Sequence, residues 1–172
     1  MINCLRILTL VLLLVPSMAA CSGSSESTAR EGVMVGSRAY DFTLESLDGE
    51  RISLSDLKGS VVLVNFWATW CPPCQAEIPD FEEAYRQREG DGFVVLGVNV
   101  EEPASEVLPF ASDMGITYPV VLDRDGTVRR AYRALGLPTS LLVDRDGMIR
   151  FRQEGIVTAS ELAWHLAELM PD

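Results

Sequence analysis

Histidine, cysteine and clustered basic side chains are scarce in this sequence, which has one histidine and four cysteines. A structural zinc site takes four such ligands, but only Cys71 and Cys74 form a close pair, with Cys21 near the start and His165 near the end, so the chain is not expected to hold one. The formal net charge is −11, and no stretch concentrates lysine and arginine, which excludes a nucleic acid as the partner. Long apolar runs are missing as well, because the run at residues 7–15 is too short to span a bilayer.

That short apolar run belongs to a pattern typical of a secretory signal peptide, predicted here over residues 1–20. Arg6 precedes the run, and the small residues that follow it end at Cys21. Residues 16–21 (PSMAAC) resemble the lipobox of bacterial lipoproteins, in which the signal is cut before the cysteine and the thiol carries a lipid. Met18 departs from the leucine usual in that motif, and ordinary cleavage after Ala19 is the alternative.

Counting cysteines supports lipidation of Cys21. Once the signal is removed, Cys21, Cys71 and Cys74 remain, and pairing of the last two leaves Cys21 as an odd thiol. A thioether to lipid resolves this. Residues 21–35 are mostly small and polar and are expected to form a flexible tether. The predicted location is therefore the extracytoplasmic (periplasmic) face of a bacterial membrane, with the folded domain at residues 36–172.

Hydrophobic patterns predict alternating strands and helices in that domain, which has a globular composition. A hairpin is expected around Asp48-Gly49, and Gly136 and Ser160 are expected to close one helix and cap another. The expected elements are the hairpin at 39–57, strands at 61–67, 93–100 and 117–123, helices at 72–88, 103–114, 127–136 and 160–170, and two strands within 139–155. This order favours an α/β fold with a mixed sheet.

The chemistry concentrates in residues 65–79, NFWATWCPPCQAEIP. A C-x-x-C pair that opens a helix after a buried strand is a redox motif. The first turn of a helix has unpaired N–H groups and partial positive charge, so a thiolate at Cys71 is expected to have a lowered pKa. Cys74, one turn further along, is the expected resolving thiol. A half zinc site and a purely structural disulfide are the competing interpretations, and both are disfavoured.

WATWCPPCQAEIP resembles the active site of the thioredoxin superfamily, most of all its membrane-tethered TlpA/ResA/CcmG-type thiol–disulfide oxidoreductases. The resemblance runs from about residue 36 to the end and includes Gly-Leu-Pro-Thr at 136–139. It implies a thioredoxin-like α/β sandwich: a mixed central sheet with helices on both faces, an N-terminal β-hairpin extension and a short central helical insert. It also implies no cofactor other than a redox-active Cys71–Cys74 disulfide, and no metal.

The same resemblance assigns residues to substrate binding and proton transfer. Pro138 matches a cis-proline that faces the cysteine pair, so Leu137 and Thr139 are expected beside an extended substrate segment, with Trp70 and Pro72 on the other side. Thioredoxins carry a buried aspartate where this chain has Asn65, which cannot titrate. Glu77 lies three residues after Cys74 on the same helix face and is expected to assist proton transfer to and from Cys74.

The direction of electron flow is predicted from the residues between the cysteines. Strong oxidants of the superfamily tend to carry Pro-His there, whereas this chain has Pro72-Pro73, which favours a reductase of extracytoplasmic protein disulfides. The resemblance implies a DsbD- or CcdA-like membrane thiol donor and apocytochrome c as one substrate, and a monomer is expected. A disulfide-forming oxidase, a thiol peroxidase and a lipoprotein that only binds a partner are the alternatives.

Overall fold

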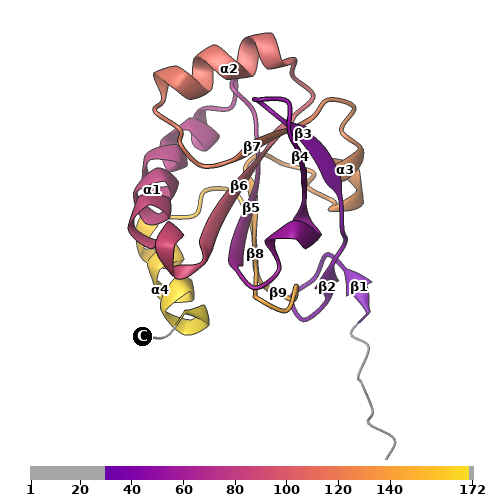
Figure 1. Cartoon of the computed structure of the whole chain (residues 1–172), viewed down its shortest axis with the longest axis vertical. Coiled ribbons are helices and arrows are strands. Elements are labelled where there is room, and N and C mark those ends of the chain that lie inside the picture. The colour runs from indigo at the N-terminus through magenta and orange to yellow at the C-terminus, as the bar shows by residue number, and fades with distance from the viewer. Residues whose placement is uncertain (1–29, 171–172) are drawn as a thin grey trace, which may run out of the picture.

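The computed structural model describes residues 30–170 of the chain, arranged around a seven-stranded mixed sheet (Figure 1). The strand order is β4-β3-β7-β6-β5-β8-β9. In chain order these strands are β3 (Thr43–Ser46), β4 (Arg51–Ser53), β5 (Val61–Trp67), β6 (Phe93–Val100), β7 (Val120–Asp123), β8 (Thr139–Val143) and β9 (Ile149–Glu154). A separate parallel pair is formed by β1 (Glu31–Gly32) and β2 (Arg38–Ala39).

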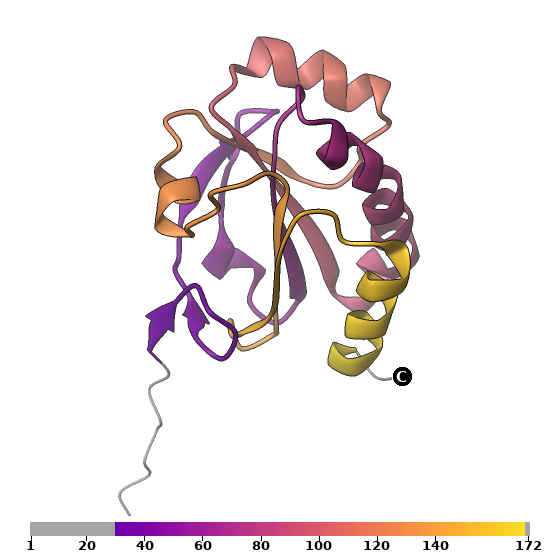
Figure 2. The ribbon, with the colours of Figure 1, turned by 180° about the vertical axis from the view of Figure 1, so that it is seen from behind.

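Helices cover both faces of the sheet, as predicted. They are α1 (Pro72–Arg88), α2 (Ala104–Asp113), α3 (Thr127–Ala131) and α4 (Ala159–Leu169). One hydrophobic core contains buried residues of α1, α2 and α4, and a second core on the opposite face contains Val128 of α3 and Leu54. Figures 1 and 2 show α1 and α4 side by side at one flank, with α3 at the other.

β5 positions the reactive segment. All of its residues are buried, which fits a continuous apolar run between two covered faces. It pairs in parallel with β6 and antiparallel with β8. The carboxyl end of β5 therefore delivers the chain to the start of α1 beside the beginning of β8.

The N-terminal hairpin and the central insert are both confirmed. β3 and β4 pair antiparallel, and Gly49 in the connecting turn has a φ of +87°, which glycine adopts without steric cost. β3 also pairs antiparallel with β7, so the hairpin extends the main sheet. The helical insert is α2, which lies between β6 and β7 along the chain.

The expected boundary between tether and domain was placed too late in the sequence. Residues 30–35 belong to the fold, because β1 lies within them and Val33 is buried in the second core. The backbone N–H of Gly36 then donates to the carbonyl of Ile149. The predicted signal peptide and Cys21 lie outside the described residues. Within residues 30–170, no helix has both the length and the apolar character needed to cross a membrane.

Two predicted helix ends were wrong, each for a local reason. α3 ends at Ala131, and its closing residue is Arg133, with a φ of +50°, instead of Gly136. The N–H of Ala134 donates to the carbonyl of Arg129 across this helix end, as in a Schellman motif. Arg133 takes the left-handed position of that motif, which is usually a glycine. The cap of α4 is Thr158, whose hydroxyl accepts from the N–H of Glu161, instead of Ser160.

Candidate active site

Cys71 and Cys74 lie at the amino end of α1 and form a disulfide. Cys71 is the N-cap residue and Pro72 begins the helix, where a missing N–H costs nothing. The N–H of Cys74 donates to Cys71 Sγ over 3.3 Å. When the pair is reduced, the same N–H and the helix terminus face a thiolate on Cys71, which stabilises the nucleophilic form.

The two sulfurs differ in how a partner can reach them. Cys71 retains 3% of its accessible surface and Cys74 retains none. Trp70 directly before the pair is 67% exposed, and Pro72 is exposed as well. A partner protein that approaches over Trp70 and Pro72 therefore meets Cys71 first, as expected for a nucleophile with a resolving thiol behind it.

The segment expected to face the cysteines lies at the start of β8. The Leu137–Pro138 peptide bond is cis, as predicted. Thr139 pairs with Phe66 near the end of β5, and its hydroxyl donates to the carbonyl of Gly136 over 2.7 Å. Leu137 packs against the core that includes both cysteines. The fold thus brings residues 137–139 and the cysteine pair, which are far apart in sequence, to the same end of the sheet.

Glu77 is a buried carboxyl one turn after Cys74 in α1, with only 1% of its surface exposed. Its carboxylate oxygens accept from Asn65 Nδ2 over 2.7 Å and from the N–H of Val157 over 3.1 Å. Burial raises the pKa of Glu77 to about 7, and these two hydrogen bonds oppose only part of that rise. A carboxyl with this pKa can both accept and donate a proton near neutral pH.

Asn65 has a role that sequence reasoning missed. The sequence indicates only a non-titrating residue in place of an acid, yet the Asn65 amide donates to Glu77 and also to Ser140 Oγ, over 3.0 Å. Asn65 is 1% exposed within a strand that is otherwise apolar. A buried amide needs hydrogen-bond partners, so an asparagine within an otherwise apolar strand indicates a polar contact in the core.

Glu102, at 5% exposure, is a second missed residue. Its carboxylate accepts from the N–H of Thr69 over 2.8 Å, from the Thr69 hydroxyl, and from Asn99 Nδ2 over 2.7 Å. Gln75 Nε2 donates to the carbonyl of Thr69 over 2.6 Å. Thr69 is therefore held on both sides, and this fixes the chain that leads into Trp70 and Cys71.

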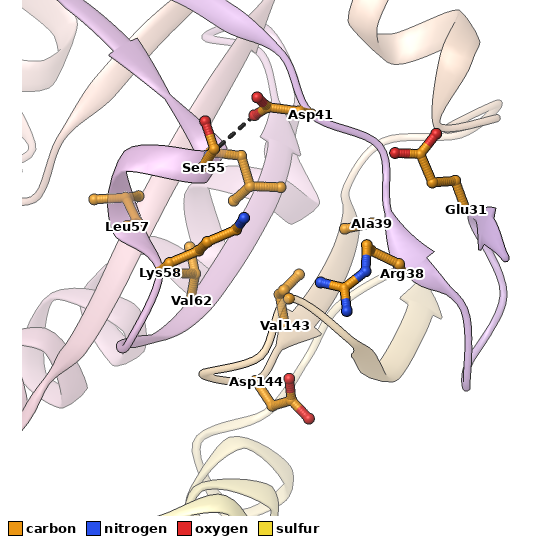
Figure 3. A pocket seen from close by; sticks show the side chains of 12 residues that line it. Glu31, Arg38, Ala39, Asp41, Ser55, Leu57, Lys58, Val62, Val143 and Asp144 are labelled. Carbon is orange, nitrogen blue, oxygen red and sulfur yellow. Dashed lines mark hydrogen bonds between the residues drawn. The ribbon is translucent and has the colours of Figure 1, made fainter. Parts of the chain in front are cut away.

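An apolar hollow lies elsewhere on the molecule. It has a volume of about 120 Å³, and none of the predicted site residues lines it (Figure 3). Aliphatic side chains of Leu57, Val62 and Val143 line its wall, and Asp41 accepts from the N–H of Ser55 at its edge. Within residues 30–170, no three histidine, cysteine, aspartate or glutamate side chains are placed to hold a metal ion.

Comparison with known proteins agrees with this geometry. The model of the AhpC/TSA family matches residues 35–152. The thiol-disulfide oxidoreductase ResA of Geobacillus thermodenitrificans is 37% identical over 162 residues, covering 94% of this chain and 93% of that protein. The ResA of Bacillus subtilis is 38% identical, covering 83% of this chain and 79% of that protein. The crystal structure of a putative thiol:disulfide interchange protein DsbE from Chlorobium tepidum superimposes with a TM-score of 0.73, at 32% identity, over 80% of this chain and 97% of that one.

Proposed function

This chain belongs to the AhpC/TSA family and is a thiol–disulfide oxidoreductase of thioredoxin-like fold, and on that premise we propose that it reduces protein disulfides outside the cytoplasm. The observation that carries the direction is the buried acid beside the cysteine pair. A strong oxidant is one whose reduced, thiolate form is stabilised. Here the negative charge of ionised Glu77, one turn from Cys74, opposes a thiolate, which makes the dithiol a better electron donor.

Catalysis is a pair of thiol–disulfide exchanges. The Cys71 thiolate attacks one sulfur of the substrate disulfide, and the other substrate sulfur leaves and takes up a proton. Cys74 then gives its proton to the Glu77 carboxylate and attacks Cys71 Sγ, which releases the second substrate thiolate. The protonated Glu77 then gives up this proton, and the released substrate thiolate is protonated. Two electrons pass to the substrate, and the Cys71–Cys74 disulfide is left.

The enzyme then needs an external source of electrons. We assign that role to a DsbD- or CcdA-like membrane thiol donor, and one substrate to the cysteines of apocytochrome c before haem attachment. The signal sequence and the lipobox-like residues before Cys21 support an anchor on the extracytoplasmic face of a membrane. Replacing Cys21 with serine should release the protein from membrane fractions, whereas a variant that stays bound to them would contradict the lipid anchor.

The activity is tested with the protein prereduced by dithiothreitol and then freed of it. Mixed with insulin, the prereduced enzyme should transfer its electrons stoichiometrically, and the new insulin thiols can be counted with a thiol reagent after the two proteins are separated. The Cys71→Ser variant should transfer none. If prereduced enzyme leaves insulin oxidised but consumes hydrogen peroxide, the thiol peroxidase alternative is correct. If the oxidised enzyme instead forms disulfides in a reduced substrate, the oxidase alternative holds.

A further inference from the structure

The loop that joins α3 to β8 (orange in Figures 1 and 2) is fixed by side chains that donate to its backbone. Arg152 of β9 donates to the carbonyls of Tyr132 and Arg133 over 3.1 and 3.0 Å. Arg129 of α3 donates to the next two carbonyls, those of Ala134 and Leu135, over 2.9 and 3.2 Å. The hydroxyl of Thr139 donates to the carbonyl of Gly136. Every backbone carbonyl from residue 132 to residue 136 therefore accepts a hydrogen bond from a side chain.

Each of the two arginines has an acidic partner of its own. Arg129 Nη1 lies 3.2 Å from Glu101, which follows β6, and Arg152 Nη2 lies 3.2 Å from Glu154. A planar guanidinium that holds two carbonyls and a carboxylate is fixed in orientation. The loop conformation is therefore set before any partner binds, which lowers the entropy lost on binding.

This fixed loop presents an apolar side chain to solvent. Leu135 is 80% exposed, the most exposed large hydrophobic residue in the described part of the chain. Two residues later, Leu137 packs against the core that includes the cysteines, and cis-Pro138 follows. Single exposed leucines are common on proteins. This one, however, lies on a clamped loop, two residues before the leucine that packs against the core of the cysteine pair.

We propose that Leu135 selects substrates that carry a large apolar side chain next to a cysteine of the target disulfide, and that Arg129 is the positioning residue for this contact. The inference rests on the proposed reductase function and names its substrate class. Exposed Trp70 supplies a second apolar surface beside Cys71, which also favours an apolar side chain in the substrate. An acidic residue at that position of the substrate would not be attracted to a protein with a net charge of −11.

The test compares two synthetic peptides, each with one internal disulfide, that differ in having leucine or serine directly before the first cysteine. Dithiothreitol recycles the enzyme, and its uncatalysed rate with each peptide is subtracted. Wild-type enzyme should reduce the leucine peptide with a kcat/KM about tenfold above that of the serine peptide, as expected for one apolar contact. Leu135→Ser should bring this ratio close to one. The matched control is Leu108→Ser, which removes a second exposed leucine, on α2. This variant should keep the wild-type ratio of kcat/KM between the two peptides.

Arg129→Lys tests the positioning role, because lysine keeps the charge but lacks the planar fork of donors that reaches both carbonyls and Glu101 in one fixed orientation. It should raise KM for the leucine peptide more than for the serine peptide. Arg130→Lys is the control, since Arg130 of the same helix donates to Asp125 and Thr127 and to no carbonyl of the loop. The potential of the cysteine pair, measured in each variant, separates a loss of substrate contact from a disturbed active site.

Several results would overturn the inference while leaving the proposed function intact. Equal kcat/KM values for the two peptides in wild type would do so, and so would an unchanged ratio in Leu135→Ser. Arg129→Lys behaving as Arg130→Lys does would remove the positioning role. Failure of wild-type enzyme to reduce either peptide or hydroxyethyl disulfide would instead reject the reductase function itself.

Discussion

Glu77 provides a prediction whose size follows from the structure. Its pKa in the folded protein is about 7, against an ordinary value of 4.5. The folded state thus keeps the Glu77 proton in a pH range where the unfolded chain has released it. This contribution to stability is fully present below about pH 4.5 and is lost as the pH rises to about 7. At about 1.4 kcal/mol for each pH unit, the loss is about 3 kcal/mol.

The perturbation is Glu77→Gln, which keeps the side-chain shape and removes the titration. The free energy of unfolding of the oxidised protein would be measured by urea denaturation from pH 4 to pH 8. The value for wild type minus that for Glu77→Gln should fall by about 3 kcal/mol across this range. Glu83→Gln, on an exposed part of the same helix, gives the background for an acid-to-amide change.

A wild-type-minus-variant difference that stays constant with pH would contradict the raised pKa of Glu77. It would mean that Glu77 ionises alike in the folded and unfolded states, and that burial does not hold a proton there. The proton transfer proposed between Glu77 and Cys74 would then lose its physical basis, because a carboxyl of ordinary pKa stays ionised at neutral pH.

Three further outcomes are expected. Cys74→Ser should trap a mixed disulfide between Cys71 and a substrate protein, visible as a heavier band on a non-reducing gel that dithiothreitol removes. Asn65→Ala removes a hydrogen bond that lowers the pKa of Glu77, so the pH profile of disulfide reduction should move to higher pH in stopped-flow assays. Glu102→Ala leaves buried donors unpaired and should lower the free energy of unfolding by about 3 kcal/mol in urea titrations.

The parts of the molecule that depend on local sequence could be predicted. β5 is a continuous apolar run, and α1 begins at a cysteine followed by Pro72, so strand, helix start and reactive pair were all readable. The hairpin around Gly49 carried its own turn signal. These features need only the periodicity and capping chemistry of neighbouring residues.

The parts that depend on distant residues could not be read in this way. The environment of Glu77 includes Val157, far along the chain, whose N–H donates to the carboxylate. The residues after α3 were expected to continue a helix, but their carbonyls are held by side chains, among them Arg152 from β9. Tertiary contacts of this kind override local helix preference and have no signature in the segment itself.

The reduction potential of the Cys71–Cys74 couple is the most direct test of the proposed direction of electron flow. It would be obtained from equilibria with glutathione or dithiothreitol, followed by tryptophan fluorescence. We expect a value near or below that of thioredoxin, about −270 mV, as a reductase fed by a membrane donor requires. A value near that of a strong disulfide-forming oxidant, about −120 mV, would contradict the proposed direction of electron flow.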